Sequence, residues 1–126
     1  MRTVVHFGLD CEGPPGYVHG GCAAAVADEA LGLAASNYAG SLVRTANLQI
    51  NFRAPLPLSG TYVVEAICRP RQKGERKVYV DWKLLPLPRQ GQQEGAVGQQ
   101  QAGRGGERRP YQEGEALFVA VGLSKL

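Results

Sequence analysis

Alternation of hydrophobic and polar residues predicts two of the strands in this chain. One side chain in two is apolar between residues 44 and 52, and the same period recurs between residues 78 and 84. This pattern is typical of a strand with one buried face and one wet face. Thr45, Asn51 and Arg53 then share the wet face of the first segment. The predicted buried side chains are Ala46, Leu48, Ile50 and Phe52 in the first segment, and Val78, Val80, Trp82 and Leu84 in the second.

Three other segments complete the predicted sheet. Residues 3–8 form a short β-rich run that ends at the turn CEGPPG, whose prolines and glycines cannot continue a ladder. Residues 61–69 begin another long strand, joined to residues 78–84 by the hairpin connection PRQKGE. Residues 115–123 are a continuous apolar run, typical of a strand paired on both sides.

Only residues 22–35 show a convincing helical period. Their apolar positions form one face, made largely of alanine, which lets a sheet approach the helix axis closely. The order of strand, helix and four strands predicts an α+β domain, with one antiparallel five-stranded sheet wrapped around one long helix. The apolar face comprises Ala23, Val26, Ala27, Ala30, Leu31 and Ala34.

Residues 86–114 interrupt this pattern with a segment rich in glutamine and glycine and nearly empty of large apolar groups. Such a composition cannot offset the entropy of ordering, so we expect a long, mobile loop between the last two strands. At 126 residues, the chain is long enough for one core and too short for two. We therefore predict a single domain over residues 1–126.

Composition and charge exclude several classes of function. No apolar run approaches the length of a membrane span, so we expect no membrane span and a soluble intracellular protein, in the cytoplasm or an organelle matrix. The net charge of +3 is too small to indicate nucleic-acid binding. The three cysteines form no CxxC pair and are predicted to be reduced thiols. The two histidines lack ligand spacing, so no metal site is expected.

Positive charge is concentrated between residues 69 and 77, where five basic residues face one acidic residue, Glu75. One interpretation is a solvated hairpin tip, and the other is a docking point for a phosphorylated ligand. The basic residues are Arg69, Arg71, Lys73, Arg76 and Lys77.

The start of the helix carries the candidate chemistry. A helix that begins near Gly20 leaves free N–H groups in its first turn, where the macrodipole favours an oxygen that gains negative charge. Gly20 and Gly21 also let another molecule approach the main chain, although His19-Gly20-Gly21 could simply turn the chain. Asp28 has no propensity reason to lie in mid-helix. It is either an exposed carboxylate or a general base or nucleophile toward an acyl carbon.

Helix geometry sets a condition on these two groups. Gly20 and Asp28 are eight residues apart, which corresponds to about 12 Å of rise. One reacting carbon cannot touch both. If both act on one acyl group, the carboxylate must come from a second subunit across a two-fold axis.

Three segments resemble the hotdog-fold acyl-CoA thioesterases, most nearly the branch that includes mitochondrial long-chain acyl-CoA thioesterases. They are EGPPGYVHGGCAAAVADEALG, VRTANLQINFRAPLPL and GERKVYVDW, and both their order and their intervals agree. Many hotdog thioesterases place an Asn where this chain has Gly13, but the branch with EGPPG lacks it too. The resemblance implies hydrolysis of fatty acyl-CoA without a cofactor, by a homodimer or a dimer of dimers.

The resemblance also assigns roles to individual residues. His19 and Gly20 would supply the main-chain N–H that polarises the thioester carbonyl, with Gly21 beside them. Asp28 would be the catalytic carboxylate, and Thr45 the hydroxyl that helps place water. Asn51, Arg53 and Arg76, with Lys77 beside them, would contact coenzyme A. A noncatalytic acyl-CoA-binding or scaffold protein on the same fold is the alternative, because a fold does not fix a function.

Overall fold

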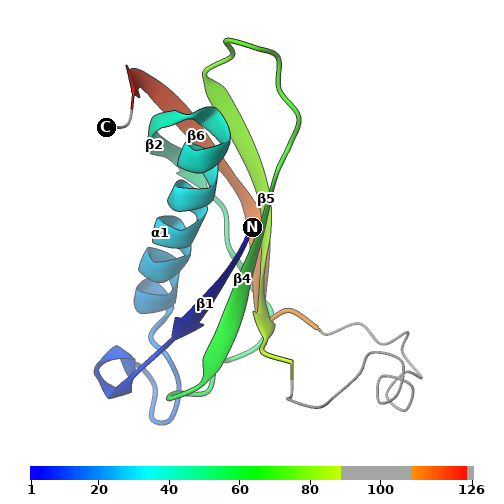
Figure 1. Ribbon diagram of the computed structural model, residues 1–126. Coiled ribbons are helices and arrows are strands. Elements are labelled where there is room, and N and C mark those ends of the chain that lie inside the picture. Colours follow the sequence, from blue (N-terminus) through cyan, green and yellow to red (C-terminus); the bar gives the residue numbers. More distant parts are fainter. Residues whose placement is uncertain (89–108, 125–126) are drawn as a thin grey trace, which may run out of the picture.

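One long helix lies along a curved antiparallel sheet in the computed structural model, which describes residues 1–88 and 109–124 (Figure 1). The sheet order is β1-β4-β5-β6-β2, with β3 paired to β6. The predicted α+β arrangement of five strands around one helix is confirmed, and the short β3 is added to it. The elements are β1 (Arg2–His6), the 3-10 helix η1 (Leu9–Cys11), α1 (Gly20–Ala39), β2 (Ser41–Leu48), β3 (Asn51–Phe52), β4 (Thr61–Cys68), β5 (Lys77–Pro86) and β6 (Gln112–Ser124).

Helix α1 begins before the predicted segment and extends one turn beyond it. It ends at Gly40, which adopts the left-handed conformation (φ 69°, ψ 27°) and donates its N–H to the Ser36 carbonyl over 2.9 Å. Glycine tolerates this conformation, so the chain reverses in one residue and enters β2 at Ser41. No helix within residues 1–88 and 109–124 has both the length and the apolar character needed to cross a bilayer.

The core lies between α1 and the sheet. Ala27, Leu31 and Ala35 on the helix are almost completely buried, as are Val78, Val80, Trp82 and Leu84 on β5. The alternation predicted for β5 is therefore confirmed. Each large apolar side chain on this face contributes roughly 1.5–3 kcal/mol by burial, and the small alanines keep the helix close to the strands.

The predicted strand over residues 44–52 is wrong in its continuity and only partly right in its buried face, since Leu48 and Ile50 are half-buried against the core. It is split into β2 and β3, and its register against β6 shifts between Thr45 and Asn47. Ala46 and Phe52, predicted to be buried, are exposed. Because β2 pairs only with β6, it forms the edge of the described sheet. An edge position and a bulge both remove the simple link between alternation and burial.

Long-range contacts hold the chain at this break. The Gln49 N–H donates to the Glu115 carbonyl over 2.8 Å, and the Trp82 Nε1–H donates to the Gln49 carbonyl over 3.3 Å. Gly114 leaves room for that carbonyl, because a β-carbon at Gly114 would lie 2.0 Å from the Gln49 oxygen. The break therefore depends on a glycine 65 residues away in sequence.

The predicted loop over residues 86–114 is too long at both ends. Strand β5 continues to Pro86, and β6 begins at Gln112. Tyr111, just before β6, packs edge-on against the Tyr62 ring with 5.2 Å between centroids. The remainder of that prediction, residues 89–108, lies outside the described residues.

Candidate active site

The turn into α1 leaves one backbone donor free. His19 is the N-cap, in extended conformation, and its Nδ1 accepts the Gly21 N–H over 2.9 Å. The His19 carbonyl accepts the N–H groups of Cys22 and Ala23, each over 3.0 Å. The Gly20 N–H has no acceptor in the part of the chain that the structure describes. Of the two candidate glycines, only Gly20 thus offers an unoccupied donor at the positive end of the helix.

The preceding loop fixes the position of His19. The His19 N–H donates to the Cys11 carbonyl over 2.7 Å, and the Gly13 N–H donates to the Tyr17 carbonyl over 2.9 Å. A β-carbon at Gly13 would lie 2.7 Å from His19 Cα. An Asn at this position therefore does not fit the present loop, which accounts for the glycine noted in the sequence.

Two thiols lie beside the same turn. Cys11 precedes the loop, and Cys22 lies in the first turn of α1; both are half-buried and free, as is Cys68, in agreement with the predicted reduced state. A hydrogen bond with Cys11 raises the pKa of the Cys22 thiol, and partial burial raises it further. Cys22 is therefore a thiol rather than a thiolate near neutral pH.

Asp28 and Thr45 come together within one chain. Asp28 lies half-buried on α1, and the Thr45 Oγ1–H donates to its Oδ1 over 2.7 Å. The neighbouring Glu29 is exposed. The hydroxyl orients the Asp28 carboxylate and leaves its second oxygen free to accept a proton from water.

The structure does not bring Gly20 and Asp28 together. Gly20 is the first residue of α1, and Asp28 follows eight residues later on the same uninterrupted helix. Their separation along the axis is about 12 Å.

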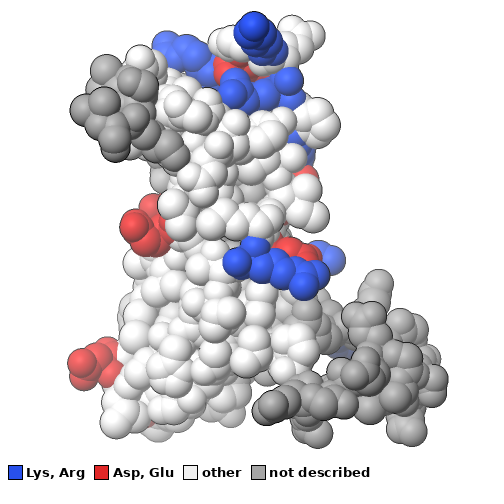
Figure 2. Space-filling model, viewed as in Figure 1, with Lys and Arg blue, Asp and Glu red and all other residues white. Residues whose placement is uncertain are grey.

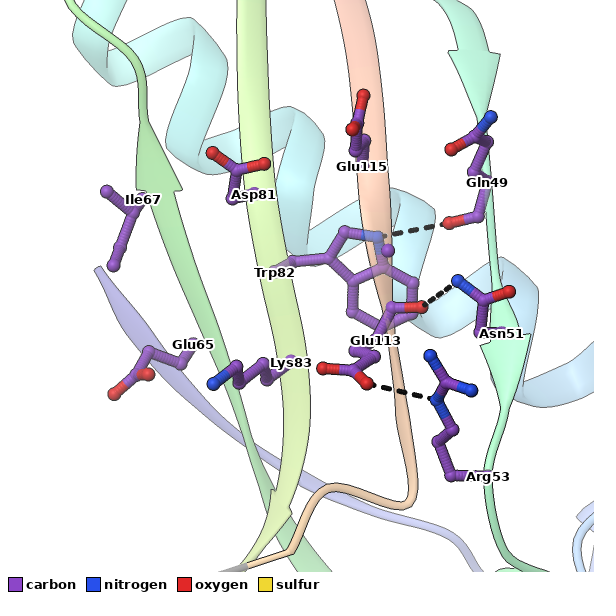
Figure 3. A pocket seen from close by; sticks show the side chains of 11 residues that line it. Gln49, Asn51, Arg53, Glu65, Ile67, Asp81, Trp82, Lys83, Glu113 and Glu115 are labelled. Carbon is purple, nitrogen blue, oxygen red and sulfur yellow. Dashed lines mark hydrogen bonds and ion pairs between the residues drawn. The ribbon is translucent and has the colours of Figure 1, made fainter. Parts of the chain in front are cut away.

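Asn51 and Arg53 lie on the opposite face of the sheet from Thr45. Both line a groove of about 390 Å³ on the face turned away from α1 (Figure 3). The Asn51 Nδ2–H donates to the Glu113 carbonyl over 3.4 Å, and the Arg53 Nε–H donates to the Glu113 carboxylate over 3.0 Å. Thr45 instead bonds to the helix. The predicted common face of these three residues is wrong, because the register shift after Thr45 and the break before Asn51 interrupt the alternation.

Arg76 and Lys77 lie at the far end of the sheet. The Arg76 Nε–H donates to the Ala120 carbonyl over 3.0 Å, whereas Arg53 directly follows the residue that pairs with Gln112. These two β6 positions are eight residues apart, or about 27 Å along the strand. No single phosphate can contact both Arg53 and Arg76 of one chain.

Basic side chains gather where β4 turns into β5 (Figure 2). The arginines there already have internal partners. Arg69 forms ion pairs with Asp81 and Glu115, and Arg71 donates to the Glu75 and Ala39 carbonyls. The side-chain ammonium groups of Lys73 and Lys77 have no hydrogen-bond or ion-pair partner among the described residues. The tip is thus partly a structural feature, and its free ammonium groups remain available to an anion.

An apolar cavity that the sequence did not indicate lies beside Gly20. It has a volume of about 500 Å³, and its wall includes Val18, Phe52, Leu56 and Gln112. Gln112 escaped notice because it falls in the segment predicted to be a loop. The available signal was its even spacing from Ala116 and Phe118, which places all three side chains on one face of a strand. Ala116 and Phe118 are buried on the helix-facing side of β6.

Comparisons with known proteins agree with this architecture. A family model for the thioesterase superfamily matches residues 15–83. Acyl-coenzyme A thioesterase THEM4 of Mus musculus is 40% identical over 127 residues, an alignment that covers 98% of this chain and 45% of the relative. The chain thus spans less than half the length of the curated relatives it matches.

Two solved structures share the arrangement of strands and helix. An acyl-CoA hydrolase from Agrobacterium tumefaciens has a TM-score of 0.71 at 23% identity, covering 100% of this chain and 45% of that one. A hexameric thioesterase from Yersinia pestis has a TM-score of 0.68 at 17% identity, covering 99% of this chain and 90% of that one. At these identities the likeness shows a common fold.

Proposed function

Because the chain belongs to the thioesterase superfamily and has its hotdog fold, we propose that it hydrolyses fatty acyl-CoA to a free fatty acid and CoA. The observation that carries this proposal is the free Gly20 N–H at the start of a helix that also carries a hydroxyl-bonded carboxylate, Asp28. Acyl transfer needs these two groups, a donor for the oxyanion and a base or nucleophile for the carbonyl carbon.

The reaction follows from these groups. The Gly20 N–H binds the thioester oxygen, and Asp28 takes a proton from a water molecule that adds to the carbonyl carbon. The tetrahedral intermediate collapses, the C–S bond breaks, and the CoA thiolate leaves and is protonated. If Asp28 instead attacks directly, an anhydride forms first and water then cleaves it. In both routes Thr45 orients the carboxylate, and His19 holds the turn that presents Gly20.

We propose that the site is shared between two copies of the chain. The distances of about 12 Å between Gly20 and Asp28, and about 27 Å between Arg53 and Arg76, prevent either pair from acting at one point within one chain. Strand β2 lies at the sheet edge, with β6 as its described partner. A two-fold axis beside β2 would run a second copy in the opposite direction and bring opposite ends of the two chains together.

Coenzyme A would then contact both copies. Arg53 and Asn51 of one chain, and Arg76 and Lys77 of the other, supply the groups for its phosphates. The Arg53 guanidinium is shared with Glu113, but 54% of the Arg53 side chain is exposed, so its remaining N–H groups can reach a ligand.

Turnover of a long-chain acyl-CoA by matched variants tests the proposal. Asp28→Asn should lower kcat by about 100-fold or more, because a general base contributes about that much or more. Glu29→Gln is the control, since it removes the adjacent exposed acid and should leave kcat unchanged. A wild-type protein that binds acyl-CoA without turning it over would favour the noncatalytic alternative. Equal activity in Asp28→Asn and wild type would remove Asp28 from the mechanism.

A further inference from the structure

The cavity beside Gly20 has walls suited to an apolar ligand. Val18 and Leu56 line it as buried side chains, and Phe52 and Pro55 line it from β3 and the following loop. The ring of Phe52 lies in ordinary van der Waals range of Gly20, at 3.6 Å from the position of a β-carbon there. The cavity therefore adjoins the N–H that is proposed to bind the thioester oxygen, and its volume of about 500 Å³ lies in the range of small-molecule sites.

One polar side chain is buried in this apolar wall. Gln112 is 2% exposed and is the only buried polar or charged residue among those described. Its Oε1 has no hydrogen-bond partner within residues 1–88 and 109–124. Its neighbours along the same face of β6, Ala116 and Phe118, are apolar core residues. A leucine would fill this position without an unpaired amide oxygen, so the glutamine is unfavourable for the folded protein alone.

We propose that Gln112 selects acyl groups that carry a hydroxyl, and that the cavity holds the acyl chain of such a thioester. This inference rests on the proposed function, since it assigns the acyl end of the substrate to the cavity beside Gly20. A carboxamide both donates and accepts, and so does a hydroxyl, so one substrate hydroxyl satisfies the Oε1 and receives a hydrogen bond from the Nε2.

Burial makes such a contact selective. A ligand without the hydroxyl leaves the buried Oε1 unpaired, whereas a ligand that carries it removes that penalty. Exposed polar groups at the rim, such as Arg53, have water as an alternative partner and discriminate less.

The pantetheine arm of CoA also carries amide groups that could pair with Gln112. The apolar walls favour the acyl chain instead, because the arm would bury further polar groups there without partners. The two sources are distinguishable, since the arm is common to free CoA and every CoA thioester.

Binding of non-hydrolysable acyl-CoA analogues tests the inference independently of turnover. Analogues of one chain length, unsubstituted or with a hydroxyl at successive carbons, are titrated by calorimetry into wild type and Gln112→Leu. At least one hydroxylated analogue should bind wild type about tenfold tighter than the unsubstituted one. Gln112→Leu should abolish that preference and leave the affinity for free CoA unchanged. Gln112→Met serves the same purpose if the leucine variant does not fold, and Gln72→Leu, at the exposed hairpin tip, is the matched control.

Three results would overturn the inference. These are equal binding of all analogues by wild type, a hydroxyl preference that persists without Gln112, and an equal loss of affinity for free CoA and all analogues in the variant. The last result would assign Gln112 to the pantetheine arm. Selective binding without hydrolysis of the corresponding thioester would reject the proposed activity and keep the selectivity. Hydrolysis without hydroxyl preference would reject the selectivity and keep the proposed activity.

Discussion

Two inactive variants of this protein should regain activity when their subunits are mixed. Asp28→Asn removes the base, and Gly20→Pro removes the oxyanion donor. Because these groups lie about 12 Å apart on one helix, whereas a base must come within roughly 3 Å of the proton it removes, each working site needs Gly20 from one chain and Asp28 from the other. A heterodimer of the two variants has one site with both groups intact and one site with neither.

The structure indicates that both variants keep the fold. The Gly20 N–H has no acceptor among the described residues, so proline removes a donor without breaking a hydrogen bond, at the helix position where proline is best tolerated. His19 before it is extended (φ −65°, ψ 133°), as the residue preceding a proline should be. In Asp28→Asn, the Thr45 hydroxyl can still donate to the amide oxygen.

The expected magnitude follows from counting sites. Each heterodimer should approach about half of wild-type activity, and random exchange of equal amounts should give about a quarter for the whole mixture, since about half of the dimers are mixed. Variants with different affinity tags allow heterodimers to be isolated by two successive purifications and assayed for thioester cleavage. If isolated heterodimers remain as inactive as their folded parents, Gly20 and Asp28 do not act across a subunit boundary.

Other changes probe separate parts of the structure. Neutralising Arg53 and Arg76 together should raise KM for acyl-CoA by about tenfold or more with little change in kcat, because distant phosphate contacts bind ground and transition states alike. Steady-state kinetics that show an unchanged KM would contradict a role of these arginines in binding the CoA phosphates. Gly114→Ala should lower the free energy of unfolding, measured by urea denaturation, by about 1–3 kcal/mol through overpacking against the Gln49 carbonyl. The control Gly8→Ala, with open space around Gly8, should have little effect. Alkylation of Cys22 by iodoacetamide at pH 8, followed by peptide mass spectrometry, should be slower in the folded than in the unfolded protein and should accelerate as the pH rises. The reason is that the fold raises the pKa of this thiol and disfavours the reactive thiolate. Equal rates in the folded and unfolded protein would show that the thiol is unperturbed.

Local patterns predict the central elements of this fold well. Val78, Val80 and Leu84 alternate in sequence and are all buried, because β5 has paired neighbours on both sides and the helix above one face. Around Gln49, in contrast, the alternation predicts neither the continuity of the strand nor all of its buried side chains. Its break depends on the Trp82 indole and on the space left by Gly114, and neither contact is visible in the local sequence.

The candidate site likewise contains residues that the sequence predicts and one that it does not. Gly20 and Asp28 belong to one helix, with His19 as its N-cap, so the spacing of the two residues along the chain already gives their separation in space. Gln112 does not, because its burial depends on pairing with Leu84 and Phe52 on two other strands. The glutamine- and glycine-rich sequence before Gln112 favours a loop, but pairing with the two other strands overrides that local preference.

The one-residue connection at Gly40 links assembly to chemistry. Helix α1, which carries Asp28, passes directly into the edge strand β2, which is proposed to meet the second subunit. A shift of β2 therefore has no flexible segment in which to be absorbed before it reaches the helix. Specific activity should then depend on protein concentration, falling on dilution as subunits separate. By mass action, a substrate that contacts both chains should in turn hold the dimer together at concentrations where the free protein dissociates.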